Sequence, residues 1–160
     1  MSKRLLIMRH GEAAHATPDV ERPLTDRGIN EVIRASRFAL EQGVQLDQLV
    51  HSVAARTGMT AEYFAQINRL PPDVLQSKPE LYQVTVGGIL QQVNDFDSEW
   101  EAVGLIGHNP AISYLVEYLA SNAESCALGT ADIAVLDFKV DHWEEVAQLT
   151  GKLVLRYPEA

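Results

Sequence analysis

The feature that most constrains the fold is a short apolar run that ends in two cationic or ionisable side chains. Residues 5–8 read Leu-Leu-Ile-Met, and Arg9, His10 and Gly11 follow directly. Four consecutive apolar residues before a turn are typical of a strand that is buried on both faces. In open α/β sheets, the loops that leave the carboxyl ends of such strands surround the ligand crevice. The pattern therefore predicts that Arg9 and His10 lie at a ligand site.

Further strand-like and helix-like segments alternate along the chain. Short apolar segments that indicate strands lie at 46–52, 102–107, 133–138 and 152–157. Helical spacing of apolar residues is found after Thr25, which is expected to cap a helix that ends at Gly43, and again over 60–67 and 112–119. This alternation predicts an α/β fold, a three-layer sandwich with a mostly parallel central sheet flanked by helices.

The remaining segments carry weaker patterns. Residues 71–85 show no regular spacing, 86–95 have a weak helical pattern, and 143–149 are expected to form a turn or a short helix. Asn109 is expected to cap the helix over 112–119, with Pro110 as its first residue.

Length and cysteine content favour one domain over residues 1–160 in a reducing compartment. The chain has 160 residues, of which 46% are hydrophobic, so a single substantial core is expected. The only cysteine, Cys126, has no partner for an internal disulfide. The first apolar run is too short for a signal sequence or a membrane span. We therefore expect a cytoplasmic protein.

Charge excludes some classes of partner and favours another. The formal net charge of −9 argues against nucleic acids and anionic membranes, which bind clustered Lys and Arg. However, residues 1–37 hold seven Lys/Arg against five Asp/Glu, whereas residues 73–160 hold four against fourteen. Basic residues are thus concentrated around the first strand, where they favour a pocket for an anion.

Three strand-to-helix junctions carry the candidate chemistry. Arg9 and His10 follow the first strand, Arg56 lies near the first turn of the helix after the second, and His108 follows the strand over 102–107. With right-handed crossovers, these junctions open on one edge of the sheet. Two guanidinium groups and two imidazoles are therefore expected to converge there.

These motifs resemble those of the histidine phosphatase superfamily, which has a phosphoglycerate mutase-like fold. Arg9-His10-Gly11 matches the signature after the first strand, residues 52–60 (SVAARTGMT) match the second motif, and residues 107–110 (GHNP) match the third. Residues 22–28 (RPLTDRG) add a fourth match. This segment, together with the short length of the chain, most resembles the short phosphohistidine phosphatase branch. The short chain also leaves little room for a cap over the site.

The resemblance implies a role for each matching residue. His10 corresponds to the nucleophile that forms a covalent phosphohistidine, which water then hydrolyses. Arg9, Arg56 and His108 correspond to the groups that bind the phosphoryl oxygens, where transition-state charge is spread. Arg22 is either an anchor of its own loop or a contact to phosphate or partner.

The proton donor for the leaving group is the least defined part of the expected site. Many relatives use a carboxylate, and Glu80 is the nearest candidate by chain order. A leaving imidazole needs less help than an alkoxide, because its conjugate acid has a pKa of about 6.5. A pocket without an acid would therefore suit a phosphohistidine substrate.

We therefore expect a cofactor-free phosphatase that acts on phosphohistidine in a partner protein such as a phosphotransfer domain. The alternatives are a phosphatase for a small phosphoester and a phosphate-dependent binding protein without turnover. A metal is not expected, because His10 and His15 lack a suitably spaced third ligand and nearby arginines repel cations. The sequence leaves the oligomeric state open.

Overall fold

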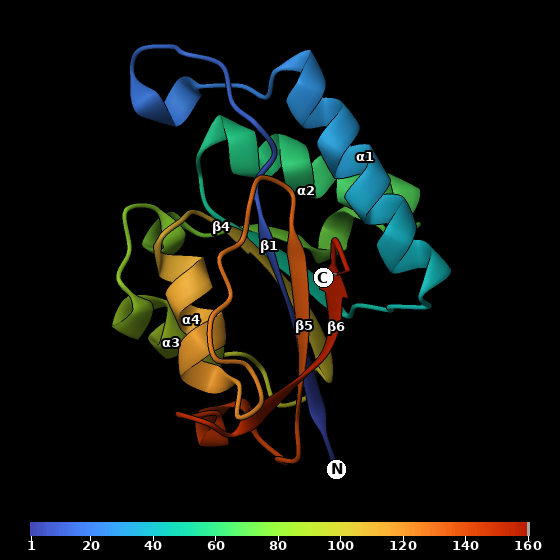
Figure 1. Cartoon of the computed structure of the whole chain (residues 1–160), viewed down its shortest axis with the longest axis vertical. Coiled ribbons are helices and arrows are strands. Elements are labelled where there is room, and N and C mark those ends of the chain that lie inside the picture. The colour runs from blue at the N-terminus through green and yellow to red at the C-terminus, as the bar shows by residue number, and fades with distance from the viewer. Residues whose placement is uncertain (160) are drawn as a thin grey trace.

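A six-stranded sheet forms the centre of the molecule (Figure 1). The structure is a computed structural model and describes residues 1–159. The strand order is β3-β2-β4-β1-β5-β6, in which the first four are mutually parallel, while β5 runs antiparallel to both β1 and β6. The strands are β1 (Lys3–Arg9), β2 (Gln48–His51), β3 (Leu75–Ser77), β4 (Ala102–Gly107), β5 (Ile133–Phe138) and β6 (Gly151–Tyr157). The prediction of a mostly parallel sheet is confirmed.

Helices cover both faces of this sheet, and the alternation of side chains along β1 divides the core between them. Leu6 and Met8 pack in a cluster with the first two helices, whereas Leu5 and Ile7 pack in a cluster with the other two. Figure 1 shows the same two pairs on opposite faces. The helices are α1 (Asp26–Glu41), α2 (Ala55–Ile67), α3 (Val86–Asn94) and α4 (Ala111–Leu119). The predicted three-layer sandwich is therefore confirmed.

Both predicted ends of α1 are confirmed. The Thr25 hydroxyl accepts a hydrogen bond from the Gly28 amide (2.9 Å), and Gly43 adopts a φ of 71° just beyond the last turn. A side-chain acceptor at the start and a left-handed glycine after the end satisfy backbone groups that the helix leaves unpaired. The same helix begins beside the loop that follows β1.

One segment without a clear pattern forms short elements, and one prediction about a helix start is wrong. Residues 71–85, which show no regular spacing in the sequence, contain the three-residue strand β3 and the 3₁₀ turns Pro72–Val74 and Pro79–Leu81. In addition, α4 begins at Ala111, one residue later than expected, and Asn109 does not cap it. Instead, the Asn109 side chain accepts a hydrogen bond from Ser113 (2.6 Å) and donates one to the carbonyl of Leu128 (2.6 Å).

The described part of the chain has no helix that is both long and apolar enough to cross a membrane.

Candidate active site

The register of the parallel strands β1 and β4 brings the two candidate histidines together. Arg9 of β1 is paired with Gly107 of β4, so His10 and His108 leave adjacent strands at the same level. Their ring centroids are 5.3 Å apart, and the planes are inclined by 59°. The His10 amide also donates to the Gly107 carbonyl (3.3 Å). The sheet itself thus holds the two imidazoles side by side.

Arg56 reaches the same edge from the helix that follows β2. It is the second residue of α2, and only 8% of its side chain is exposed. The Thr60 hydroxyl donates to the Arg56 carbonyl (2.7 Å) and accepts from the Gly11 amide (3.2 Å). This hydroxyl therefore ties the first turns of α2 to the loop that carries His10.

The hydrogen bonding of His10 defines which of its ring nitrogens is basic. His10 Nδ1 lies 2.6 Å from the carbonyl oxygen of Gly11, which is only an acceptor, so Nδ1 carries the proton. Burial, together with the positive charges of Arg56, Arg9 and Arg22, lowers the pKa of His10 to about 4, although the Gly11 bond acts in the opposite direction. At neutral pH, His10 is therefore uncharged, with a lone pair on Nε2.

A hydroxyl pair orients His108. Its Nε2 lies 2.6 Å from Ser52 Oγ, which in turn lies 2.9 Å from Thr57 Oγ1. Burial, followed by the proximity of His10 and Arg56, lowers the pKa of His108 to about 4. A neutral His108 donates from Nδ1 when Ser52 donates its hydroxyl hydrogen to Nε2. Nδ1 is buried and has no hydrogen-bond partner among residues 1–159.

Arg9 contacts the segment that precedes β5 through one long hydrogen bond. Its Nη1 donates to the Leu128 carbonyl (3.3 Å), and its buried Nε has no partner in the described residues. Burial lowers the pKa of Arg9, and the carboxylates of Asp132 and Glu31 partly oppose this effect. Arginine stays charged at neutral pH even so, because its reference pKa is above 12. Arg9 therefore adds a cation with donors that the protein does not satisfy.

The sequence pattern did not indicate that Asp19 contacts the site. Its carboxylate accepts hydrogen bonds from Tyr82 Oη (2.6 Å), Arg56 Nη2 (3.0 Å) and Arg22 Nη1 (3.1 Å). Its backbone carbonyl also accepts from Arg56 Nη1 (2.9 Å). The Tyr82 ring packs edge-on against His108, with centroids 5.7 Å apart. Asp19 and Tyr82 thus border the site, with Asp19 beside Arg56 and Tyr82 beside His108. We call these two residues the rim.

Arg22 and Glu80 differ in how they relate to the site. Arg22 contacts its border, and Glu80 does not contact Arg56. Arg22 donates to the Ala14 carbonyl (2.8 Å) as well as to Asp19, so it anchors the loop between β1 and α1. Glu80 is exposed within the turn Pro79–Leu81. The carboxylate that contacts Arg56 is that of Asp19, not that of Glu80.

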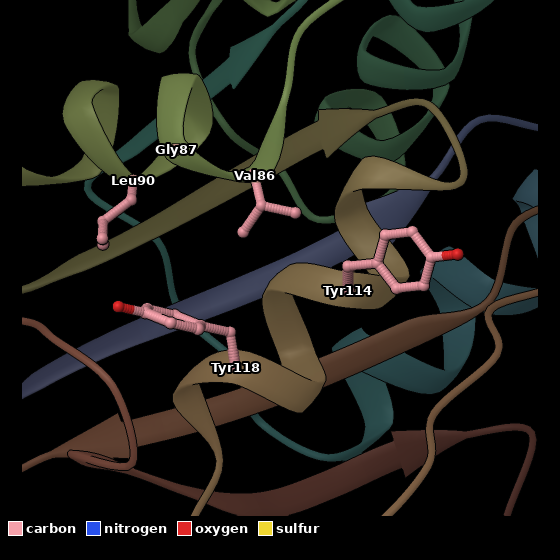
Figure 2. Close-up of a pocket in the computed structure, with 5 residues that line it drawn as sticks. All are labelled: Val86, Gly87, Leu90, Tyr114 and Tyr118. Carbon is pink, nitrogen blue, oxygen red and sulfur yellow. The ribbon is translucent and has the colours of Figure 1, made fainter.

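A hollow away from these residues is lined by uncharged side chains. A shallow hollow of about 400 Å³ lies between α3 and α4, lined by Val86, Gly87, Leu90, Tyr114 and Tyr118 (Figure 2). None of these residues carries a charge, so the hollow is unsuited to phosphate. Within residues 1–159, no group of three or more His, Cys, Asp or Glu side chains is arranged to hold a metal ion.

Comparison with solved structures identifies the fold. The chain superimposes on a protein assigned as the phosphohistidine phosphatase SixA of Nakamurella multipartitia, with a TM-score of 0.84, 24% identity and coverage of 98% of this chain and 95% of that one. It also superimposes on the protein histidine phosphatase SixA complexed with tungstate, with a TM-score of 0.82, 27% identity and coverage of 96% and 95%.

A structural neighbour of lower similarity is assigned a different substrate. This protein, assigned as an alpha-ribazole-5'-P phosphatase of Escherichia coli K-12, has a TM-score of 0.68 and 17% identity, with 96% of this chain and 95% of that one covered. No family model matches the sequence, and no curated protein matches it. The chain therefore has the histidine phosphatase fold, as its motifs predicted, and the similarity supports a phosphatase.

Proposed function

We propose that this protein hydrolyses phosphohistidine on a partner protein, through a covalent phosphohistidine intermediate on His10. The observation that carries the proposal is the hydrogen bond from His10 Nδ1 to the Gly11 carbonyl, which leaves Nε2 as the basic nitrogen of a ring close enough to Arg56, Arg9 and Arg22 to feel their charge. A neutral imidazole held in one tautomer beside arginine is suited to attack an anionic phosphoryl group.

The proposed reaction has two steps. In the first, the lone pair of His10 Nε2 forms a bond to phosphorus while the bond from phosphorus to the substrate nitrogen breaks in line with it. In the second, water attacks the phosphorus on His10, the bond from phosphorus to Nε2 breaks with its electrons returning to the ring, and phosphate leaves. Arg9, Arg56 and His108 hold the phosphoryl oxygens in both steps, since loose transition states for phosphoryl transfer leave most of the charge on those oxygens.

Two features favour phosphohistidine over a phosphoester as substrate. Among residues 1–159, Asp19 supplies the only carboxylate bonded to Arg56. Hydrogen bonds from Tyr82 and two arginines lower the pKa of Asp19 well below its usual value, so it is not a proton donor at neutral pH. An alkoxide leaving group needs such a donor, whereas imidazole does not. The two SixA neighbours support the same choice, and tungstate in one of them is a tetrahedral oxyanion like phosphate.

The substrate is best sought among proteins that carry phosphohistidine, such as phosphotransfer domains. As part of this proposal, the protein acts in the cytoplasm and does not bind nucleic acid or membrane. Hydrolysis of a small phosphoester and binding without turnover are the competing outcomes of the following test.

The test compares turnover of a phosphorylated phosphotransfer domain with turnover of a panel of alkyl phosphates, for the purified protein and two variants. We expect a higher kcat/KM on the phosphorylated domain than on every ester. His10→Ala should lower turnover by about a thousandfold or more. His15→Ala should leave it unchanged, since His15 is an exposed histidine of the same loop. A preference for one ester, or phosphate binding without turnover, would contradict the proposal.

A further inference from the structure

We propose that Asp19 determines the class of leaving group, because its carboxylate stabilises a proton on the departing imidazole and opposes a departing alkoxide. This inference rests on the proposed function and adds a specificity-determining residue to it.

The position of Asp19 is the first support. Its side chain is 48% exposed, whereas that of its partner Arg56 is 8% exposed and His10 is buried. Asp19 therefore lies nearer to solvent than either Arg56 or His10. In an in-line displacement the leaving group departs on the side opposite the nucleophile. Under this proposal, a group that leaves toward solvent from phosphorus on His10 departs beside Asp19, which is bonded to Arg56 (3.0 Å).

The contacts of Asp19 are the second support, because they keep the carboxylate ionised. The hydrogen bond from Tyr82 is the largest cause of its lowered pKa, followed by those from Arg22 and Arg56. Two of these three contacts come from distant segments, because Arg56 is 37 residues and Tyr82 is 63 residues away along the chain. An ionised, positioned carboxylate accepts hydrogen bonds and attracts positive charge, but it has no proton to donate.

The chemistry follows from that charge. The substrate ring carries a proton on the nitrogen that is not bonded to phosphorus, and a nearby carboxylate favours this cationic form. When His10 attacks, the electrons of the breaking phosphorus–nitrogen bond return to the ring. The ring then leaves as neutral imidazole with its proton, so no external acid is required. An alkyl phosphate instead develops negative charge on its leaving oxygen, which the Asp19 carboxylate repels.

The test measures kcat of Asp19→Asn on two substrates, phosphohistidine in a phosphotransfer domain and phosphoserine. We expect the ratio of kcat on phosphohistidine to kcat on phosphoserine to fall about tenfold or more, mainly because kcat on phosphohistidine is lost. Asp19→Glu keeps the negative charge, so its ratio of kcat values should stay close to that of the parent protein. Glu21→Gln, which removes one exposed negative charge from the same turn, should leave the ratio within about twofold of the parent.

Two results would overturn this inference. An equal loss of kcat on both substrates would mean that Asp19 only positions Arg56, and an unchanged ratio would mean that its charge has no effect on the leaving group. Circular dichroism and inhibition by inorganic phosphate report whether each variant folds and keeps its anion site. If the parent protein hydrolyses only esters, the proposed function itself fails. If it hydrolyses phosphohistidine with a ratio that Asp19→Asn does not alter, only this inference fails.

Discussion

His10 shows how a few neighbouring groups prepare one side chain for chemistry. Its Nδ1 is committed to the Gly11 carbonyl, and burial with three nearby arginines disfavours the imidazolium. An exposed histidine has a pKa of about 6.5. The ring of His10 therefore stays neutral at pH values where an exposed histidine is protonated. This protonation state is a property of the folded site that can be measured without substrate.

The pKa of His10 can be read from its ring resonances in a nuclear magnetic resonance titration. We expect a midpoint near pH 4. Arg56→Met should raise the midpoint, because it removes a positive charge that disfavours the imidazolium. Arg37→Met removes the same charge from an exposed position of α1 and should leave the midpoint unchanged. A midpoint between 6 and 7 in the parent protein would contradict the account of the site.

The residues that the sequence did not indicate are those whose role depends on contacts between distant segments. His10, Arg9, Arg56 and His108 could be predicted because each follows a recognisable strand or begins a helix. Asp19 and Tyr82 lie in irregular segments, and their hydrogen bond joins parts of the chain that no local pattern relates. The sequence Thr17-Pro18-Asp19 is typical of a turn, but a turn pattern does not indicate which residues the Asp19 carboxylate contacts.

At the scale of elements, the loop after β1 is held against the first turn of α1 by two glycines. A Cβ atom on Gly11 would lie 2.6 Å from the Gly28 carbonyl oxygen, and one on Gly28 would overlap the backbone of Glu12. In addition, the Thr25 amide donates to the Glu12 carbonyl (2.9 Å). Two motifs that are separate in the sequence, Arg-His-Gly and the segment around Thr25, thus form one close backbone contact behind His10.

Gly28→Ala tests this contact. The added methyl group should force the loop and helix apart and lower the free energy of unfolding by about 1–3 kcal/mol, measured by urea denaturation. Gly58→Ala is the matched control in α2, where a Cβ would meet only His51, at 3.8 Å. It should be neutral or stabilising by up to about 1 kcal/mol, because alanine favours the helix. Equal stability of Gly28→Ala and the parent would show that the contact is not close.

The elements that sequence could not define are short or displaced by tertiary contacts. Strand β3 has three residues, too few for an alternating pattern, and it forms because its backbone pairs with β2. The start of α4 was displaced because Asn109 uses its side chain to bridge Ser113 and Leu128 instead of capping the helix. Longer segments with a clear period, such as α1, were predicted with both ends.

At the scale of the whole molecule, the sheet topology assembles the site. The neighbours β2, β4 and β1 are parallel, so their carboxyl ends present Arg56, His108 and His10 at one edge. Loops on that edge then add Asp19 and Tyr82 above them. The alternation of strands and helices was enough to predict this edge, because right-handed crossovers leave few other arrangements. The composition of the rim required the structure.

The central claim is that His10 carries the phosphoryl group during turnover, and trapping that intermediate tests it most directly. The protein would be mixed with a phosphotransfer domain labelled with ³²P on histidine, quenched in alkali within milliseconds to seconds, and digested for peptide mapping. We predict acid-labile label on the peptide that contains His10, and none on that peptide in His10→Ala. Label on another residue, or full turnover by His10→Ala without a labelled protein, would contradict the account.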